Sequence, residues 1–184
     1  MKVGILALQG DFEAHAAILR RIGLAAIEVR TPEEVGSVDA LVIPGGESTT
    51  IRMLASAYGL IEPVRARAEA GMPILGTCAG LIACAREIAD GDEPIWPLVD
   101  VTVRRNAYGR QVESFETDLE VAGIGKVRAV FIRAPKIERV GDGVEVLARH
   151  NDTPVVVRQG SIALTSFHPE LSEDDRLHRL VLDG

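Results

Sequence analysis

The sequence predicts an α/β protein of three layers, in which helices cover both faces of a doubly wound, mostly parallel sheet. One observation is that short apolar runs alternate with amphipathic stretches through the first half of the chain. Such strand–helix units are joined by right-handed crossovers, which place the strands parallel to one another. A second observation is the length of 184 residues with 47% hydrophobic content, which suits one sizeable core. We therefore expect a single domain over residues 1–184.

The first half of the chain supplies the parallel strands. We expect strands at residues 3–8, 25–29, 40–43 and 73–75, each a short apolar run. Helices are expected to begin near Asp11, Thr31 and Ile51, and another to follow at residues 79–88, because apolar residues recur there at helical spacing.

The second half contains shorter elements. Alternating valines predict a strand at 99–103, and an apolar run predicts another at 127–132. The runs at 144–148, 155–158 and 161–167 are expected to form short antiparallel strands, before a closing helix at 172–182.

Composition excludes several classes of function. The net charge of −7 and the absence of a basic cluster argue against nucleic-acid and anionic-membrane partners. Cys78 and Cys84 fit neither a disulfide framework nor a metal site, so a reducing compartment is expected. The first apolar run spans six residues, which is too short for a signal peptide, so we expect a cytoplasmic protein.

Cys78 lies where a predicted strand turns into a predicted helix. Gly76 and Gly80 flank it in the pattern Gly-x-Cys-x-Gly, the cysteine counterpart of the nucleophile elbow of serine hydrolases. Such a turn lifts the sulfur out of the sheet and places it at a helix N-terminus, where the dipole favours the thiolate. The alternative is a buried structural cysteine, a common fate of free cysteines.

Residues 44–50, Pro-Gly-Gly-Glu-Ser-Thr-Thr, form a second candidate motif. One interpretation is a turn in which Ser48 or Thr49 caps the next helix. The other is an anion-binding loop, although the lysine and spacing of a phosphate-binding loop are lacking. Sites in doubly wound sheets lie at the carboxyl ends of the strands. This loop, Gln9-Gly10 and the Cys78 turn should therefore share one edge.

Residues 104–111, Arg-Arg-Asn-Ala-Tyr-Gly-Arg-Gln, form a basic segment in an acidic protein. A solvated loop is the default interpretation. Recognition of a carboxylate is the alternative, because the arginine fork suits that geometry.

Four histidines are available as bases. His15 and His178 fall within the first and last predicted helices, where exposed or capping roles are expected, and His150 falls in a turn. His168 differs from them, because it ends a predicted strand and precedes Pro169-Glu170.

His168 and Glu170 are predicted to share one face of the chain. A proline favours extended backbone in the residue before it, and residues two apart in an extended segment project to the same side. Glu170 can then orient His168 and stabilise its cation while His168 deprotonates Cys78. A free cysteine thiol is mostly protonated at neutral pH, so such a base would raise its reactivity.

The segments Gly76-Thr77-Cys78-Ala79-Gly80 and His168-Pro169-Glu170 together resemble the class I, triad-type glutamine amidotransferases, whose sheet is flavodoxin-like. Four further segments, residues 8–15, 45–50, 104–111 and 131–135, are similar to one branch of that family, the glutaminase subunits of pyridoxal phosphate synthases. The resemblance covers nearly the whole chain and departs from the family at the connector 94–97.

The resemblance implies that L-glutamine is hydrolysed to L-glutamate and ammonia through a glutamyl thioester on the cysteine. The positions that match the family's catalytic triad are Cys78, His168 and Glu170. Those that match its glutamine-binding positions are Gly46, Glu47, Ser48, Arg105, Ile132 and Arg133. The backbone N–H groups of Gly46 and Ala79 would form the oxyanion hole. No cofactor and no metal are expected.

The resemblance also implies a partner, a synthase subunit with a (β/α) barrel that receives the ammonia and assembles pyridoxal phosphate. Two alternatives stand beside this hypothesis. One is a different cysteine-dependent hydrolase or stress protein on a similar sheet; in those relatives a histidine often follows the nucleophile, whereas Ala79 follows Cys78 here. The other is a regulatory binding subunit that performs no catalysis.

Overall fold

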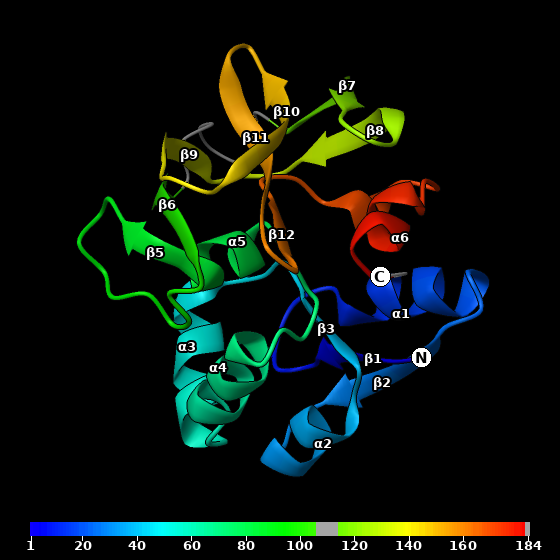
Figure 1. The fold of residues 1–184 in the computed structure, drawn as a ribbon, viewed down its shortest axis with the longest axis vertical. Coiled ribbons are helices and arrows are strands. Elements are labelled where there is room, and N and C mark those ends of the chain that lie inside the picture. Colours follow the sequence, from blue (N-terminus) through cyan, green and yellow to red (C-terminus); the bar gives the residue numbers. More distant parts are fainter. Residues whose placement is uncertain (106–113, 183–184) are drawn as a thin grey trace.

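The computed structural model describes residues 1–105 and 114–182 (Figure 1). Its helices are α1 (Phe12–Arg21), α2 (Pro32–Ser37), α3 (Ser48–Ala57), α4 (Ile61–Glu69), α5 (Ala79–Cys84) and α6 (Arg176–Leu182), with a 3-10 turn at Pro169–Leu171. Its strands are β1 (Lys2–Leu6), β2 (Ala25–Val29), β3 (Ala40–Ile43), β4 (Ile74–Thr77), β5 (Ala85–Ile88), β6 (Val99–Arg104), β7 (Phe115–Val121), β8 (Gly125–Phe131), β9 (Lys136–Val140), β10 (Glu145–His150), β11 (Thr153–Gln159) and β12 (Ile162–Thr165).

The main sheet has the strand order β10-β11-β12-β4-β3-β1-β2. The pairs from β12 to β2 are parallel, whereas β10, β11 and β12 pair antiparallel to one another. The predicted α/β fold with a mostly parallel sheet is therefore confirmed. The expectation that the segment 161–167 is antiparallel is correct for its pairing with β11 and wrong for its pairing with β4, beside which β12 runs parallel.

Two apolar layers cover the two faces of this sheet, and side-chain alternation along the strands builds them. In β3, Leu41 and Ile43 belong to one buried cluster, while Ala40 and Val42 belong to the other. Helices α2, α3, α4 and α5 pack on the first face, and α1, α6 and the β7–β8 hairpin pack on the second (Figure 1). The molecule thus has the predicted three layers.

A second, smaller sheet of order β5-β6-β9 lies beside α5. The prediction of one helix over residues 79–88 is wrong in its second half, because α5 ends at Cys84 and β5 follows at once. Ala85 and Ile88 are buried with two exposed residues between them, a spacing that also suits a helix, so the pairing of β5 with β6 decides the conformation here.

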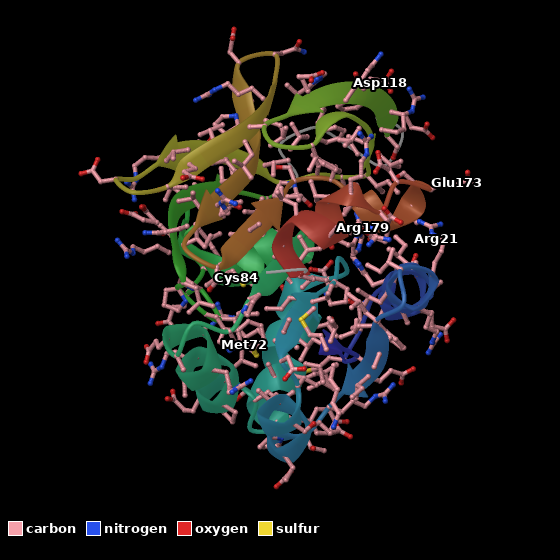
Figure 2. The ribbon with its side chains drawn as sticks, turned by 45° about the vertical axis from the view of Figure 1, so that its right-hand side comes forward. Arg21, Met72, Cys84, Asp118, Glu173 and Arg179 are labelled. Carbon is pink, nitrogen blue, oxygen red and sulfur yellow. The ribbon has the colours of Figure 1, made fainter. Side chains whose placement is uncertain are left out.

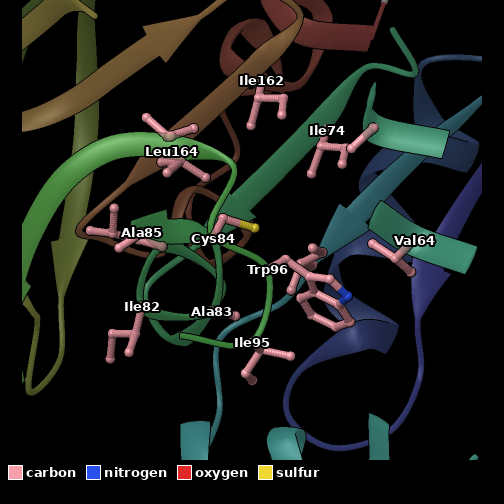
Figure 3. Packing of buried hydrophobic residues seen from close by; sticks show 14 of the residues in the cluster. Val64, Ile74, Ile82, Ala83, Cys84, Ala85, Ile95, Trp96, Ile162 and Leu164 are labelled. Carbon is pink, nitrogen blue, oxygen red and sulfur yellow. The ribbon is translucent and has the colours of Figure 1, made fainter. Parts of the chain in front are cut away.

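Cys84 ends α5 inside the apolar layer between the small sheet and α4. Figure 3 shows its sulfur among Ile74, Ile162 and Leu164, with Trp96 nearby. Burial raises the pKa of the Cys84 thiol to about 12. Cys84 is therefore a structural cysteine that stays protonated.

Several predicted helix boundaries also need correction. α3 begins at Ser48 rather than Ile51, and its N-cap residue is Glu47, so neither Ser48 nor Thr49 caps it. The closing helix begins at Arg176 rather than at residue 172. Four elements were not recognised in the sequence, namely α4, β5, β7 and β9.

The two ends of the chain meet on the second face of the sheet. Arg21 at the end of α1 donates from Nη2 to the carbonyl oxygen of Glu173, at 2.8 Å, and Figure 2 shows these residues beside one another. This bond joins α1 to the segment between the 3-10 turn, which carries Glu170, and α6. Among the helices that the structure describes, none is both long and apolar enough to span a bilayer.

Candidate active site

A cavity of about 330 Å³ opens at the carboxyl ends of the parallel strands. Its walls include nine of the ten residues predicted for the site, namely Gly46, Glu47, Ser48, Cys78, Ala79, Arg105, Ile132, Arg133 and His168. The tenth, Glu170, is buried behind His168. Gln9 also lines the cavity, so the three loops expected at this edge do converge.

Cys78 forms a strained elbow between β4 and α5. Its φ of 50° and ψ of −101° lie in a region that non-glycine residues rarely occupy. The backbone N–H of Cys78 donates to the carbonyl oxygen of Thr165 in β12, at 2.9 Å, which fixes the turn to the neighbouring strand. Cys78 is 8% exposed and lines the cavity.

Gly80 makes this elbow possible through a close backbone approach. A Cβ at position 80 would overlap with the carbonyl oxygen of Ile43 in β3. A Cβ at Gly76 would lie 2.9 Å from the carbonyl oxygen of Gly80 and 2.7 Å from Leu164. Both glycines of the Gly-x-Cys-x-Gly pattern are therefore needed for packing of the turn.

His168 and Glu170 form a hydrogen-bonded pair beside the cysteine. His168 Nδ1 lies 2.6 Å from Glu170 Oε1, and the Glu170 side chain is fully buried. The backbone N–H of His168 donates to the carbonyl oxygen of Val130 in β8, at 2.9 Å. The predicted contact is present, but the predicted extended backbone is wrong, because Pro169–Leu171 is a 3-10 turn.

The charge of His168 is governed by its two neighbours. Burial alone would lower the pKa of His168, but hydrogen bonds with Cys78 and Glu170, together with their negative charges, raise it to about 10. Since Nδ1 faces Glu170, Nε2 is the nitrogen available to the sulfur. At neutral pH the proton therefore stays on the imidazole, beside the sulfur of Cys78.

The loop after β3 lies directly against the loop after β1. Gln9 Oε1 accepts a hydrogen bond from the backbone N–H of Glu47 at 2.6 Å. A Cβ on Gly10 would overlap with the carbonyl oxygen of Gly45, and Gly46 has a φ of 149°. The Gly45–Gly46 peptide thus lies between the first loop and the cavity.

The opposite wall of the cavity carries positive charge. Arg105 follows β6 of the small sheet, and its guanidinium pairs with Asp92 at 2.7 Å and with Asp90 at 3.3 Å. Arg133 has a φ of 42°, and the carbonyl oxygen of Ile132 lies 4.0 Å from Cys78 Sγ. Of the basic segment 104–111, residues 106–111 lie outside the described residues.

Comparison with known proteins identifies the family. Residues 5–183 match the SNO glutamine amidotransferase family. The chain belongs to this family. It is 54% identical to pyridoxal 5'-phosphate synthase subunit PdxT of Frankia alni, over 99% of this chain and 94% of that protein. It is 56% identical to the PdxT subunit of Thermus thermophilus, over 98% and 96% of the two chains.

Solved structures show the same amidotransferase fold. A crystal structure of a glutamine amidotransferase superposes with a TM-score of 0.94 at 55% identity, covering 98% of this chain and 97% of the other. The structure of PurLQS from Thermotoga maritima superposes with a TM-score of 0.72 at 15% identity, covering 96% and 90%, which establishes likeness of fold alone.

Two histidines lie close to the His168–Glu170 pair, although no local pattern in the sequence predicts them there. His15 and His178 were expected to be exposed or to cap helices, and both are instead completely buried. They contact each other, and His15 contacts Glu170. Helical position alone could not reveal this, since the two histidines are 163 residues apart. Asp11, Ile82 and Leu171 also line the cavity and had not been predicted to do so.

The described residues contain no cluster of three or more His, Cys, Asp or Glu side chains arranged to hold a metal ion. The groups that this site does offer for chemistry are the cysteine, the imidazole and the carboxylate. A cysteine beside a protonated imidazole at the wall of a cavity is suited to acyl transfer.

Proposed function

We propose that the chain is the glutaminase subunit of a pyridoxal phosphate synthase, and that it hydrolyses L-glutamine to L-glutamate and ammonia. The observation that carries the proposal is the strained Cys78 elbow in contact with the His168–Glu170 pair. Membership of a glutamine amidotransferase family supports glutamine as the substrate. The names of the relatives support the synthase as the destination of the ammonia.

In the proposed mechanism Cys78 Sγ attacks the side-chain amide carbon of glutamine, forming a C–S bond and an oxyanion. His168 then gives its proton to the amide nitrogen, the C–N bond breaks, and ammonia leaves. A water molecule, deprotonated by His168, attacks the resulting glutamyl thioester and releases glutamate and the thiolate. Glu170 holds the imidazole in the tautomer that both steps require.

The oxyanion is proposed to bind the backbone N–H groups of Gly46 and Ala79. Both residues line the cavity beside Cys78, and Ala79 is the first residue of α5. One such donor is worth about 3 kcal/mol in comparable enzymes. The orientation of the Gly45–Gly46 peptide therefore decides whether the site is active.

The remaining cavity residues are proposed to bind the amino-acid part of glutamine. The guanidinium of Arg105 suits the α-carboxylate, and the carboxylate of Glu47 suits the α-ammonium group. Ser48 offers a hydroxyl group at the start of α3, and the strained segment of Ile132 and Arg133 offers backbone polar groups on the other wall.

We further propose that docking of the synthase subunit, expected to be a (β/α) barrel in the same cytoplasmic compartment, sets the Gly45–Gly46 peptide. A peptide between two glycines rotates with little steric cost, and rotation exchanges an N–H donor for a carbonyl oxygen. Gln9 and Gly10 touch this loop through the Glu47 N–H and the Gly45 carbonyl oxygen. A partner that docks against Gln9 and Gly10 could therefore shift the Gly45–Gly46 peptide directly, and with it the oxyanion hole.

The deciding experiment measures glutamate and ammonia released from glutamine by the purified chain, alone and with the synthase subunit. A Cys78→Ala variant serves as the control. We expect glutamine-dependent ammonia release from the complex and none from the variant, which should still support synthesis from added ammonium. Absence of hydrolysis by the wild-type complex would show that the chain is a binding subunit instead.

A further inference from the structure

A chain of buried polar side chains continues from Glu170 away from the cavity. Glu170 Oε1 accepts from His168, while Oε2 lies 3.3 Å from Nε2 of His15. His15 Nε2 also lies 3.3 Å from the hydroxyl oxygen of Thr77, the residue before the nucleophile. His15 Nδ1 lies 2.9 Å from His178 Nε2. The side chains of His15 and Glu170 are completely buried.

The surroundings of His15 define its tautomer. A neutral imidazole carries one N–H. Nε2 is hydrogen-bonded to the Thr77 hydroxyl at 3.3 Å, and Glu170 Oε2 lies at the same distance without accepting a hydrogen bond. An unprotonated Nε2 would instead set a lone pair against a buried carboxylate oxygen, which is repulsive. Nε2 therefore carries the hydrogen, and Nδ1 accepts from the Nε2–H of His178.

Burial keeps both histidines neutral. The pKa of His15 is held well below its usual range, first by burial and then by the nearby His178 and His168. Burial likewise lowers the pKa of His178 to about 4. The charged and titratable groups around this pair are Glu170 and His168 on the 3-10 turn, Asp174 and Asp175 before α6, and Arg21 on α1.

We propose that His15 is a positioning residue for the proposed glutaminase reaction. Its Nε2 edge is hydrogen-bonded to Thr77, lies against Glu170 Oε2 and fixes the carboxylate, while His178 holds His15 in that tautomer. The carboxylate has two oxygens, and each faces one imidazole from a different part of the chain. The hydrogen bond from His168 at Oε1 and the N–H edge of His15 beside Oε2 together disfavour rotation of the carboxylate away from His168. Because Thr77 is contacted by the same His15 nitrogen, the base pair and the nucleophile's strand are held in one register.

Among the described residues, His15 contacts Glu170 and Thr77 but does not line the cavity, so it acts on Cys78 only through those two neighbours. No proton needs to travel along the chain, because burial keeps both histidines neutral. What the arrangement supplies is a constant orientation of His168, and hence a constant stabilisation of the Cys78 thiolate.

The test compares the full-length wild-type chain with His15→Leu, His15→Gln, His178→Phe and Leu19→Ala. Glutamine at position 15 keeps an N–H donor near the place of Nε2, whereas leucine removes it. Leu19 is one helical turn from His15 in α1, is completely buried, and serves as the control for lost packing alone. The first readout is the pH midpoint of Cys78 alkylation by iodoacetamide, followed by mass spectrometry, which requires no substrate.

We expect His15→Leu to move the midpoint up by about one pH unit, a tenfold loss of thiolate at a given pH. His15→Gln should keep the wild-type midpoint, and His178→Phe should shift it in the same direction by less. Leu19→Ala should lower the melting temperature without moving the midpoint. In the complex with the synthase subunit, His15→Leu should lower kcat for glutamine about 10- to 100-fold while KM stays within about twofold.

A wild-type midpoint in folded His15→Leu would overturn the inference, and so would equal shifts in the leucine and glutamine variants. Should His15→Leu not fold, His178→Phe decides, since an unchanged midpoint there would also overturn it. The alkylation profile does not depend on whether the chain hydrolyses glutamine. Failure of the wild-type complex to hydrolyse glutamine would refute that function without changing what the alkylation profile says about His15.

Discussion

His168 Nδ1 and Glu170 Oε1 meet at 2.6 Å across a single intervening residue, Pro169, within one 3-10 turn. The pair is therefore local in sequence, and the turn itself brings the two side chains together. The cysteine that it serves comes from another strand, and Cys78 N–H reaches the carbonyl oxygen of Thr165 to join the two. Variants at Glu170 therefore test the orientation of the imidazole, and variants at Cys78 test the nucleophile.

The two cysteines should be alkylated at very different rates. Cys78 lies at the cavity beside an imidazolium, whereas burial raises the pKa of Cys84 to about 12. A glutamine-like electrophile should therefore alkylate Cys78 at least about tenfold faster than Cys84. Mass spectrometry of peptides from partly labelled protein measures the ratio, with guanidinium-unfolded protein as the control for equal intrinsic reactivity. Predominant labelling at Cys84 would refute the assignment of the nucleophile.

Replacement of the base pair should affect kcat rather than KM. His168→Asn removes the proton carrier and should lower kcat by about 10⁴-fold or more. Glu170→Gln keeps an acceptor for His168 Nδ1 but loses the negative charge, so its cost should be smaller, at most about 10⁴-fold. Steady-state kinetics of the complex measure both. Near-normal turnover in His168→Asn would mean that another base is used.

The buried histidines should make the fold sensitive to mild acid. Burial lowers the pKa of His178 to about 4, against about 6.5 in the unfolded chain. Between these values the unfolded state binds more protons, so the free energy of unfolding falls as the pH falls from 6.5 to 4. The loss is on the order of 3 kcal/mol for such a shift.

His178→Phe should remove much of that acid sensitivity. Urea unfolding at pH 7 and at pH 4.5 gives the change in free energy for each protein. Carboxylates titrate in both proteins, so the difference between them isolates the histidine. An identical pH dependence in wild type and variant would show that His178 is not the group concerned.

The elbow should tolerate no side chain at position 80. Gly80→Ala places a methyl group against the carbonyl oxygen of Ile43 and should destabilise the protein by about 1–3 kcal/mol, with loss of glutaminase activity. Gly36 in α2 is the matched control, because nothing lies within 4 Å of a Cβ built there. Gly36→Ala should stabilise the protein by about 0.5–1 kcal/mol. Thermal unfolding compares the two, and similar melting temperatures would contradict the packing argument.

Activation by the synthase subunit should be measurable as a change in the rate of glutamine hydrolysis. Loss of one oxyanion donor corresponds to roughly a 100- to 1000-fold drop in turnover. If the Gly45–Gly46 peptide is misoriented in the free chain, saturating synthase subunit should raise glutaminase turnover by up to that factor. Rates with and without the partner that agree within about twofold would mean that the oxyanion hole is already formed.

Most of the fold and the core of the site were predictable from local patterns in the sequence. β2 and β3 match their predicted ranges, because each is a short apolar run between clear breakers. The Cys78 elbow and the His168–Glu170 contact were predictable because each lies within a few residues of sequence. The helix predicted to run to Ile88 was wrong because pairing with β6, a tertiary contact, decides the conformation of residues 85–88.

The buried network beyond Glu170 could not be predicted from such patterns. His15 and Thr77 are 62 residues apart, and His15 and His178 are 163 apart, so only the packing of α1, β4 and α6 brings them together. A polar residue on a helix is usually exposed, and the sequence contains no local sign that these two point inward.

The two sheets divide the site between them. Cys78 and His168 follow β4 and β12 of the main sheet, which pair in fixed parallel register, whereas Arg105 follows β6 of the small sheet. Insertions or register shifts in the small sheet would move the guanidinium without disturbing the distance between sulfur and imidazole. With Arg105 in its proposed role of binding the α-carboxylate, exchange of the small sheet should change the preference among amino-acid amides and leave the cysteine and the imidazole in place.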